Sequence, residues 1–395
     1  MNKILIINSL YHPNNVGGAE RSVQLLAEGL KKHGVRPVIV STADTDSTDQ
    51  VNDIKVYYLR IPNAYWMRTA KQQPAYKKPF WHLLDSYNPF AAARLAEIIT
   101  AEKPDLIHTN NLAGFSVSTW ETARKHKLPI VHTIRDHYLL CPNSTMYKND
   151  KNCEKQCGGC RLYSIPRKRH SLHIDAVVGV SRFILDKHLR YGYFGESKIK
   201  SFIYNAADFN LANNRTKGAD EPVTFGCVGL MAPIKGTEYL LERFAAMNPD
   251  RAKLKIFGRG ITKRYEKKLI ERFRGDKIEF MGHRKPEDIY SQIDIAIIPS
   301  LCDDAFPRIV IESYSCGIPI IATGMGGTSE VVDVNKTGFV FDPAVPGDLE
   351  DRISKFIADP GLIEQMSVHC LEKAKIFQID NVVNKYIEIY SQAAG

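Results

Sequence analysis

The sequence predicts an α/β protein with two doubly wound, Rossmann-like domains that face a cleft. Short apolar runs alternate with segments whose apolar residues recur at helical spacing, which is typical of parallel sheets covered by helices on both faces. The alternation stops in the polar stretch 206–222 and resumes at Val223. A chain of 395 residues also has room for about two domains of usual size.

Residues 1–205 form the first predicted domain. It opens with a strand at Lys3–Asn8, followed by a glycine-containing loop and a helix at Ala19–Lys32. The later strands are expected at Arg36–Ser41, Asp105–His108, Ile130–Ile134, Asp175–Val180 and Lys198–Tyr204. The later helices are expected at Ala91–Ala101, Phe115–Lys125 and Arg182–Tyr191, the last of them capped by Ser181.

Residues 223–375 form the second predicted domain, and 206–222 form the linker. Its strands are expected at Val223–Val228, Lys253–Phe257, Lys277–Phe280, Asp294–Ile298 and Ile318–Ala322, each followed by a helical segment. Residues 376–395 are expected to form a helix that packs back on the first domain. In doubly wound sheets ligands bind beyond the carboxyl ends of the strands, so functional residues are sought in the loops that follow strands.

The composition is that of a globular protein without a membrane span. Hydrophobic residues make up 44% and charged residues 25% of the chain, and no apolar run approaches the roughly 18 residues of a membrane helix. The apolar run Ile4–Ile7 is too short for the core of a signal peptide. We therefore expect a cytoplasmic protein.

The net charge of +9 belongs to the first half of the chain. Residues 1–220 hold 31 Lys and Arg against 19 Asp and Glu, whereas residues 221–395 hold 22 against 25. This asymmetry favours a polyanionic partner for the first half, either nucleic acid or the anionic inner face of a cell membrane. A solvated surface with a mild excess of lysine explains the charge equally well.

Three glycine-containing loops follow predicted strands and precede helices. They contain Gly17-Gly18-Ala19-Glu20, then Gly229 with Lys235-Gly236, and then Gly258-Arg259-Gly260. Glycines let the backbone approach a ligand, and the free amides at a helix start favour an anion, although each loop alone is as well explained by a tight turn. None matches the Walker pattern, which argues against a nucleotide triphosphatase.

The segment from Asp303 to Glu330 combines carboxylates with glycine-rich loops. Asp304 and Glu312 lie eight residues apart, the first before a predicted helix and the second within it. Gly324, Gly326 and Gly327 follow the next predicted strand. Carboxylates beside loops that present backbone amides suit a ligand that carries both hydroxyls and phosphates, such as a sugar nucleotide.

Taken in order along the chain, these segments resemble the retaining glycosyltransferases of family 4, which have the two-domain GT-B architecture. The resemblance covers nearly the whole chain, and the order and spacing of the segments make it specific. It rests on Gly17–Glu20, Thr133–Cys141, Val180-Ser181, Asn205–Asp208, Gly229 through Lys235-Gly236, Asp304 through Glu312, Gly317–Pro319, Gly326-Gly327 through Glu330, and Thr337-Gly338.

The resemblance implies roles for the matched residues in binding a nucleotide diphosphate sugar. Glu312 is expected to bind the ribose hydroxyls, Asp304 the hydroxyls of the donor sugar, and Lys235 the diphosphate. The Gly17-Gly18 loop is expected near the reacting phosphate and the acceptor. The other expected donor contacts are Gly229, Arg259, Phe306, Pro307, Arg308, Ile309, Gly326, Gly327 and Glu330. The residues expected at the reacting centre are Asp304, Lys235, Arg135 and Asp136.

The resemblance also implies transfer without a protein nucleophile and without a required cofactor. In this family the anomeric configuration is retained, by front-face attack in which the leaving phosphate takes the acceptor proton. Catalysis then consists mainly of positioning and of electrostatic stabilisation of the departing diphosphate.

Three positions depart from the family pattern. Asp304 stands where a glutamate is usual, so the contact with the donor sugar is one methylene shorter. Leu230 stands where the family commonly has an arginine, so Arg259 or Arg308 is expected to replace that cation. Arg135 stands where a histidine usually precedes the aspartate, and a guanidinium cannot act as a base.

Four of the eight cysteines fall within twenty residues: Cys141, Cys153, Cys157 and Cys160. Four thiolates at short spacing suit a structural zinc ion, although the spacing is not that of a standard zinc ribbon. Reduced or redox-active thiols and an iron–sulfur cluster are the alternatives.

Residues 65–82 interleave aromatic and basic side chains. Such a segment can lie in a membrane interface, contact a lipid-linked acceptor or stack on single-stranded nucleic acid. A crossover that packs its aromatic residues on the first domain is the structural alternative.

We therefore expect a glycosyltransferase that moves a sugar from a nucleotide diphosphate sugar to a glycan or lipid-linked acceptor in surface polysaccharide synthesis. It is expected in the cytoplasm, with peripheral attachment to the inner face of the cell membrane as one option. A non-catalytic protein that binds sugar nucleotides is the first alternative, and a zinc-containing nucleic-acid binder is the second.

Overall fold

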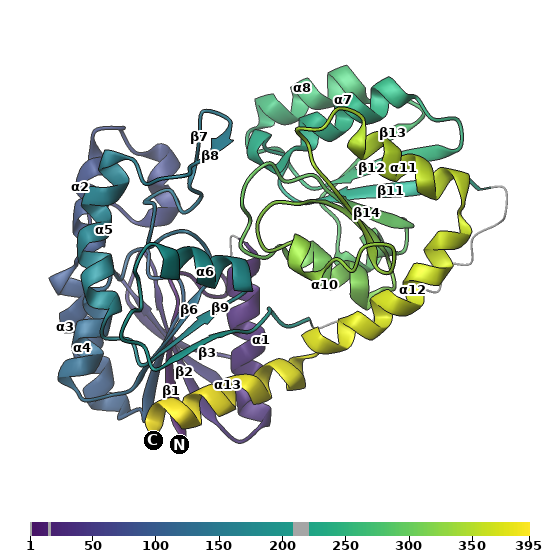
Figure 1. The fold of residues 1–395 in the computed structure, drawn as a ribbon. Coiled ribbons are helices and arrows are strands. Elements are labelled where there is room, and N and C mark those ends of the chain that lie inside the picture. Colours follow the sequence, from purple (N-terminus) through teal and green to yellow (C-terminus); the bar gives the residue numbers. More distant parts are fainter. Residues whose placement is uncertain (1, 15–16, 208–220) are drawn as a thin grey trace. The chain divides into compact units, whose positions relative to one another are not determined.

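A computed structural model describes residues 2–14, 17–207 and 221–395 of the chain (Figure 1). The chain forms two compact units. Unit 1 contains residues 1–146, 153–206 and 379–395, and unit 2 contains residues 147–152 and 207–378. Residues 208–220 of the predicted linker lie outside the described residues.

Unit 1 is built on an eight-stranded sheet with the order β10-β9-β6-β5-β1-β2-β4-β3. All neighbouring strands are parallel except β3 and β4, which are antiparallel at one edge. The strands are β1 (Lys3–Ile7), β2 (Arg36–Thr42), β3 (Ser47–Val51), β4 (Ile54–Leu59), β5 (Leu106–Thr109), β6 (Ile130–Ile134), β9 (Ala176–Gly179) and β10 (Ile199–Phe202).

Helices cover this sheet, and the inner strands are buried along almost their whole length. The helices are α1 (Gly18–Lys32), α2 (Lys77–Ser86), α3 (Pro89–Glu102), α4 (Ser118–Lys125), α5 (Gly158–Ser171), α6 (Arg182–Arg190) and α13 (Ile379–Ala394), with a 3₁₀ turn at Met67–Gln72. Residues Ile4–Ile7 of the central strand β1 are fully buried. Strands that are buried on both faces read as continuous apolar runs, and this is why the sequence predicts them well.

The C-terminal helix α13 packs in unit 1. Val382, Val383, Tyr386 and Tyr390 join the same buried cluster as residues of β1 and α1. Gly29 of α1 permits the contact, because a Cβ atom there would lie 2.5 Å from Cγ2 of Val383. The C-terminal part of the chain belongs to unit 1 from residue 379 onward, three residues after residue 376, where the C-terminal helix was expected to begin.

Unit 2 is built on a six-stranded, fully parallel sheet with the order β13-β12-β11-β14-β15-β16. Its strands are β11 (Val223–Val228), β12 (Ala252–Phe257), β13 (Ile278–Gly282), β14 (Ile295–Ile298), β15 (Ile320–Thr323) and β16 (Gly338–Phe341). Its helices are α7 (Thr237–Met247), α8 (Lys263–Phe273), α9 (Pro286–Tyr290), α10 (Arg308–Ser315), α11 (Asp348–Ala358) and α12 (Gly361–Ala374), with 3₁₀ turns at Pro233–Lys235, Ser329–Val331 and Lys375–Phe377. Numbered from its own first strand, the order is 3-2-1-4-5-6, the order of dinucleotide-binding Rossmann folds.

The strand order reverses between β11 and β14 in unit 2, and between β1 and β5 in unit 1. At such a switch point the loops leave neighbouring strands in opposite directions and open a crevice beyond their carboxyl ends. The predicted functional loops after β11 and β14 therefore meet at the switch point of unit 2.

A small hairpin corrects the predicted domain boundaries. Strands β7 (Tyr147–Lys148) and β8 (Lys151–Asn152) lie in the part of the chain assigned to the first domain, yet residues 147–152 belong to unit 2. The side chain of Asn152 explains this, because it donates to the backbone oxygen of Leu301 at 3.2 Å and accepts from the backbone nitrogen of Asp303 at 3.0 Å.

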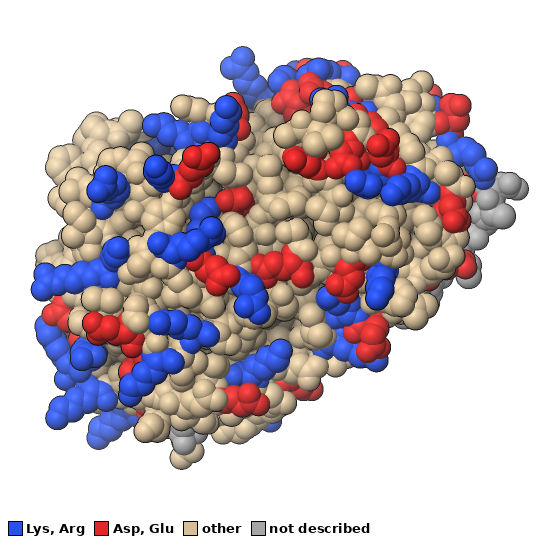
Figure 2. Space-filling view, in the orientation of Figure 1, with Lys and Arg blue, Asp and Glu red and all other residues tan. Residues whose placement is uncertain are grey.

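On the face shown in Figure 2, charged side chains of both signs are spread over the surface. Within the described ranges, no helix combines the length and the apolar composition needed to cross a bilayer.

Candidate functional site

The loops after β11 and β14 approach each other closely in unit 2. Gly236, which precedes α7, has a φ of +70°, and a Cβ atom there would lie 1.8 Å from the backbone oxygen of Pro299. The backbone nitrogen of Leu301 donates to the oxygen of Ile234 at 3.0 Å. Only glycine fits this crossing, so the glycine after Lys235 is explained by the meeting of the two loops.

Lys235 and Asp304 are the charged residues that these two loops bring together. The ammonium of Lys235 donates to Oδ2 of Asp304 in an ion pair, and both side chains are only partly exposed. Burial opposes the charge of Lys235, but Asp304 outweighs that effect and raises the pKa of the lysine. The lysine is therefore a cation held at the point where the sheet order reverses.

The loop after β15 packs on Asp304 through its glycines. Gly326 has a φ of +65°, and a Cβ atom there would lie 2.2 Å from the backbone oxygen of Asp304. The backbone nitrogen of Gly327 donates to the same oxygen at 2.8 Å. The backbone of the predicted Gly326-Gly327 pair thus fixes the loop that carries the acid, a role that the sequence did not reveal.

Glu312 lies on α10 and is held by two neighbours. Its Oε2 accepts from the hydroxyl of Tyr290 at 2.8 Å, and its Oε1 accepts from Nε of Arg308 at 3.2 Å. Each carboxylate oxygen still has a lone pair for another donor, such as a ribose hydroxyl. Nη1 of Arg308 is buried, and no protein partner for it occurs in the described ranges.

The other predicted donor contacts follow the same strands but do not all reach this cluster. Gly229 follows β11 and has a φ of +134°, and its backbone oxygen lies where a side chain at Gly258 would be. Arg259 is exposed after β12.

The predicted contacts after β14 and β15 have other roles in the fold. Phe306 and Ile309 are buried, and the ring of Phe306 lies 5.9 Å from that of Phe377, so their side chains serve packing. Pro307 is the N-cap of α10, and Glu330 lies in the 3₁₀ turn after β15.

Two residues of this region were missed by the sequence reasoning. Tyr290 is buried at the end of α9 and reaches Glu312 only in the folded chain. Asn152 comes from 149 residues before Leu301 and braces the backbone just before Asp304. No local pattern marks either contact, because both depend on tertiary structure.

The predicted residues of the first domain gather at the carboxyl ends of the strands of unit 1. Arg135, which follows β6, donates from Nε to Oδ1 of Asn110 at 2.9 Å and from Nη1 to Oδ1 of Asn205 at 2.7 Å. Nδ2 of Asn110 is buried and has no partner among the residues that the structure describes. Arg135 is therefore held in place by two hydrogen bonds, and the side-chain amide of Asn110 beside it can still donate to a ligand.

Asp136 directly follows Arg135, and Glu20, at the start of α1, lies close enough to interact electrostatically with both residues. Burial raises the pKa of Asp136 to about 6, and the backbone nitrogen of Tyr138, which donates at 2.7 Å, opposes that rise. Gly17 is the N-cap of α1, and its backbone nitrogen donates to Oε2 of Glu20 at 2.9 Å. The amide of Gly17 is thus already satisfied within the protein.

The four clustered cysteines form no disulfide. Cys157 is the N-cap of α5, and its Sγ lies 3.4 Å from that of Cys160. Burial, together with hydrogen bonds that involve Cys157 and Cys141, raises the pKa of Cys160. In the described part of the chain, no three His, Cys, Asp or Glu side chains are arranged as a ready metal site.

The cluster in unit 2 has the chemistry to hold a phosphorylated, hydroxylated ligand. A fixed cation, two carboxylates and glycine-lined backbone surround the ends of β11, β14 and β15. Its cations can neutralise phosphate charge, and its carboxylates can accept from sugar hydroxyls.

Two family models together match almost the whole chain. The model described as "Glycosyltransferase Family 4" matches residues 16–210, and the model described as "Glycosyl transferases group 1" matches residues 210–375. A Klebsiella pneumoniae protein described as an uncharacterized 42.6 kDa protein in the cps region is 31% identical over 389 residues, which is 98% of this chain and 99% of that protein. An uncharacterized glycosyltransferase of Methanocaldococcus jannaschii is 23% identical over 421 residues, covering 99% and 98% of the two chains.

Solved structures share the fold at low sequence identity. The sucrose-phosphate synthase of Thermosynechococcus elongatus matches with a TM-score of 0.77 and 18% identity over 99% of both chains. HepE of Anabaena, solved in complex with UDP-glucose, matches with a TM-score of 0.71 and 19% identity over 99% of both chains. These two likenesses support a fold of two Rossmann-like domains.

Proposed function

The chain belongs to glycosyltransferase family 4 and has the GT-B fold, and from this we propose that it is a retaining enzyme. It moves a sugar from a nucleotide diphosphate sugar to a glycan or a lipid-linked acceptor in the assembly of a surface polysaccharide. The relative in a cps region supports the pathway, and the complex of HepE with UDP-glucose supports a nucleotide sugar as donor.

One observation carries the proposal, namely the meeting of Lys235, Asp304 and Gly326 at the switch point of unit 2. In the proposed donor complex, Lys235 binds the diphosphate and Asp304 binds hydroxyls of the transferred sugar. Glu312, oriented by Tyr290, binds the ribose. Arg308 supplies the second cation that Leu230 does not provide, since its Nη1 is buried without a protein partner in the described residues.

The proposed reaction uses these groups for positioning and charge stabilisation. The acceptor hydroxyl attacks the anomeric carbon on the face that the diphosphate leaves, and the leaving phosphate oxygen takes the hydroxyl proton. Lys235 and Arg308 stabilise the negative charge that develops on the diphosphate, which is where electrostatic catalysis is usually largest. Arg135, fixed by Asn110 and Asn205, is proposed to orient the acceptor or the reacting phosphate.

A transfer assay tests this proposal. The full-length protein is incubated with UDP-glucose and other nucleotide sugars, and thermal stabilisation selects the donor, because a ligand at 100 times its Kd adds about 2.7 kcal/mol. The anomeric configuration of the product is then read by NMR. An inverted product would contradict the retaining mechanism, and stabilisation without transfer or donor hydrolysis would favour a non-catalytic binding protein, the alternative that Leu230 motivates.

We also propose that the protein works at the inner face of the cell membrane. A lipid-linked acceptor would be presented there, and the positive charge of the first half of the chain suits anionic lipids.

A further inference from the structure

Helices α2 and α5 lie side by side on unit 1 (Figure 1). Both expose large apolar side chains. On α2 and its N-cap, Tyr76 is 68% exposed, Phe80 66% and Leu83 63%. On α5, Leu162 is 60% and Ile165 63% exposed. We call these five residues the α2–α5 face. Their spacing of three and four residues puts them on one side of each helix.

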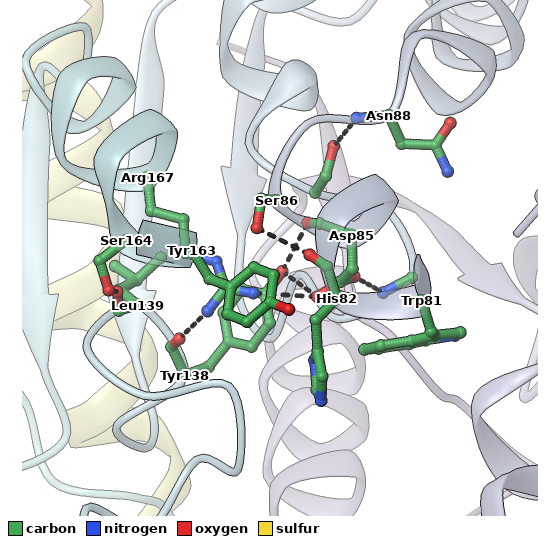
Figure 3. A network of polar contacts seen from close by, with 12 residues as sticks. Trp81, His82, Asp85, Ser86, Asn88, Tyr138, Leu139, Tyr163, Ser164 and Arg167 are labelled. Carbon is green, nitrogen blue, oxygen red and sulfur yellow. Dashed lines mark hydrogen bonds and ion pairs between the residues drawn. The ribbon is translucent and has the colours of Figure 1, made fainter. Parts of the chain in front are cut away.

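The opposite sides of the same helices carry a network of polar contacts (Figure 3). Asp85 of α2 and Arg167 of α5 have no exposed surface, and Oδ2 of Asp85 lies 3.1 Å from Nη2 of Arg167. The hydroxyl of Tyr138 donates to the same Asp85 oxygen at 2.7 Å, and Nη1 of Arg167 donates to the backbone oxygen of Tyr138. Both helices thus bury an ion pair and turn hydrophobic residues to the outside, the reverse of an ordinary surface helix.

The buried contacts fix α2 and α5 on the body of unit 1. Trp81 is buried, donates to the backbone oxygen of Tyr65 at 2.9 Å and stacks on that ring at 5.8 Å. Ser164 donates to the backbone oxygen of Leu139 at 3.1 Å. The folded unit therefore does not need the α2–α5 face for its own core, and the face stays available to something outside the chain.

The surroundings of the face are strongly basic. Residues 61–90 and 155–171 together hold nine Lys and Arg residues and one acidic residue, Asp85. Asp85 is buried against Arg167, so eight cations remain without a surface acid in these two segments. On this side of unit 1, Figure 2 shows more Lys and Arg than Asp and Glu side chains, set among uncharged surface. Protruding apolar side chains among cations are typical of helices that lie in the interface of an anionic membrane.

We propose that the α2–α5 face docks unit 1 on an anionic lipid bilayer, with the five apolar side chains entering the boundary between headgroups and acyl chains. A second copy of the chain fits poorly, because two equally basic faces would repel each other. Single-stranded nucleic acid also fits poorly, because the three aliphatic members of the face offer no ring on which a base can stack. This inference rests on the proposed location at the membrane and does not depend on the transfer chemistry.

Vesicle binding of the full chain tests the inference. Phosphatidylcholine vesicles with and without about one third phosphatidylglycerol are sedimented with the protein at low and high salt. We expect binding to the anionic vesicles that weakens as salt rises, because surface attraction is screened over about 10 Å at 0.1 M. Equal binding to neutral vesicles, or none to anionic ones, would overturn the proposal.

Matched variants locate the surface. The double change Phe80→Ser with Leu83→Ser, and separately Ile165→Ser, should each weaken partitioning at least tenfold. Val368→Ser on α12, where the valine is 68% exposed, is the control and should change nothing. An equal loss in Val368→Ser, or unchanged binding in the face variants, would refute the assignment. A change of oligomeric state in the face variants would show that a second copy covers the face.

Donor binding separates this inference from the proposed function. The face variants should keep the nucleotide-sugar affinity of the unchanged protein, since the face lies in unit 1 and the donor cluster in unit 2. Loss of vesicle binding with retained donor affinity supports the docking face. A parallel loss of both would point to misfolding, which circular dichroism and the melting temperature of each variant would reveal, and would overturn the assignment.

Discussion

Lys235 and Asp304 form an ion pair at the switch point of the second sheet, although their loops leave different strands, β11 and β14. Each charge compensates the other in the protein without ligand. In the proposed donor complex, the diphosphate would compete with Asp304 for the ammonium, and the carboxylate would then be released toward the sugar.

This relationship separates the expected effects of the two substitutions. Lys235→Ala should weaken free nucleotide diphosphate and intact donor alike by about 1.5 to 3 kcal/mol, the usual loss for a charged hydrogen bond, and should slow transfer. Asp304→Asn should keep or improve affinity for the free nucleotide, because Lys235 loses its competing anion, and should still reduce transfer. Calorimetric titration and initial rates measure both quantities.

Lys267→Ala provides the control, since that lysine is an exposed residue of α8 paired with Glu271 at 3.5 Å. If Asp304→Asn lost as much nucleotide affinity as Lys235→Ala, the proposed division of roles would be wrong. Unchanged transfer rates in both variants would contradict the proposal that this cluster takes part in catalysis.

Tyr290 is expected to act on nucleotide affinity through Glu312. Tyr290→Phe removes the 2.8 Å hydrogen bond that orients the carboxylate and should cost about 0.5 to 1.5 kcal/mol in nucleotide binding. Glu312→Gln should cost more, about 1.5 to 3 kcal/mol, because it also removes the charge that is proposed to accept from the ribose hydroxyls. Tyr314→Phe is the matched control, since that buried hydroxyl bonds to Thr337 at 2.9 Å instead. An equal affinity loss in Tyr314→Phe would assign the effect to general destabilisation.

The sequence predicted most of the parallel strands of both sheets because their apolar runs are buried on both sides, but it did not predict β4 or β16. Ile4–Ile7 and Ile295–Ile298 are examples, each bounded by polar or proline residues. The edge strand Ser47–Val51 was missed, because it is polar and mostly exposed and resembles a loop. Helices α2 and α5 were also missed, since they contain Pro79 and Pro166 and most of their buried residues are polar.

The sequence predicted the part of the site that lies in loops directly after strands. Asp304, Glu312 and Lys235 were singled out by their place beside glycines, and the structure brings Lys235 and Asp304 into contact. The support from Tyr290 and Asn152 could not be predicted, because it depends on register between elements that are distant in the sequence.

Asp136 should make the stability of unit 1 fall as pH rises. Its pKa of about 6 in the folded chain lies above the ordinary value of about 3.9. As pH rises, the unfolded chain therefore releases this proton before the folded chain does. The free energy of unfolding should fall between about pH 4 and 7 as a result. Asp136→Asn cannot ionise and should therefore gain stability over the unchanged protein as pH rises through this window, while transfer falls. Tryptophan fluorescence measures unit 1 alone, since Trp66, Trp81 and Trp120 all lie there.

Asp105→Asn should give the opposite trend. Backbone hydrogen bonds from Lys3 and Asn2 lower the pKa of Asp105. The ionised carboxylate therefore stabilises the folded chain at pH values above its ordinary pKa, and this stabilisation is lost as the pH falls through the lowered pKa. A pH-independent difference between Asp136→Asn and the unchanged protein would contradict the raised pKa.

The cysteine cluster is proposed to bind one structural zinc ion. The Sγ atoms of Cys157 and Cys160 lie 3.4 Å apart, close to the separation of about 3.8 Å between two thiolates on a tetrahedral zinc. Metal analysis of protein purified without added zinc should give about one ion per chain, and Cys157→Ser should lower metal content and folded yield more than the substrate constants. Cys370→Ala, at a buried cysteine of unit 2, is the control. A zinc content near zero with four titratable thiols in the cluster would instead identify reduced cysteines.

Disrupting the buried ion pair of Asp85 and Arg167 should cause one of the largest losses of folding free energy among the charged residues of unit 1. Both side chains are fully buried, and Asp85 also accepts from the hydroxyl of Tyr138 and the backbone nitrogen of Gly114. Asp85→Asn or Arg167→Met alone leaves an uncompensated buried charge and should cost about 3 to 5 kcal/mol. Removing both charges together, in Asp85→Leu with Arg167→Met, should cost less than the sum of the two single changes.

Denaturant unfolding followed by tryptophan fluorescence measures these costs for unit 1. Asp46→Asn breaks the half-exposed pair of Asp46 and Arg94, at 2.9 Å, and should cost under about 1 kcal/mol because exposed pairs contribute little. Since Asp85 and Arg167 join α2 to α5, their loss should also weaken the attachment of both helices and with it vesicle binding. Additive costs in the double variant, or costs as small as that of Asp46→Asn, would mean that the pair is not what holds the two helices on the unit.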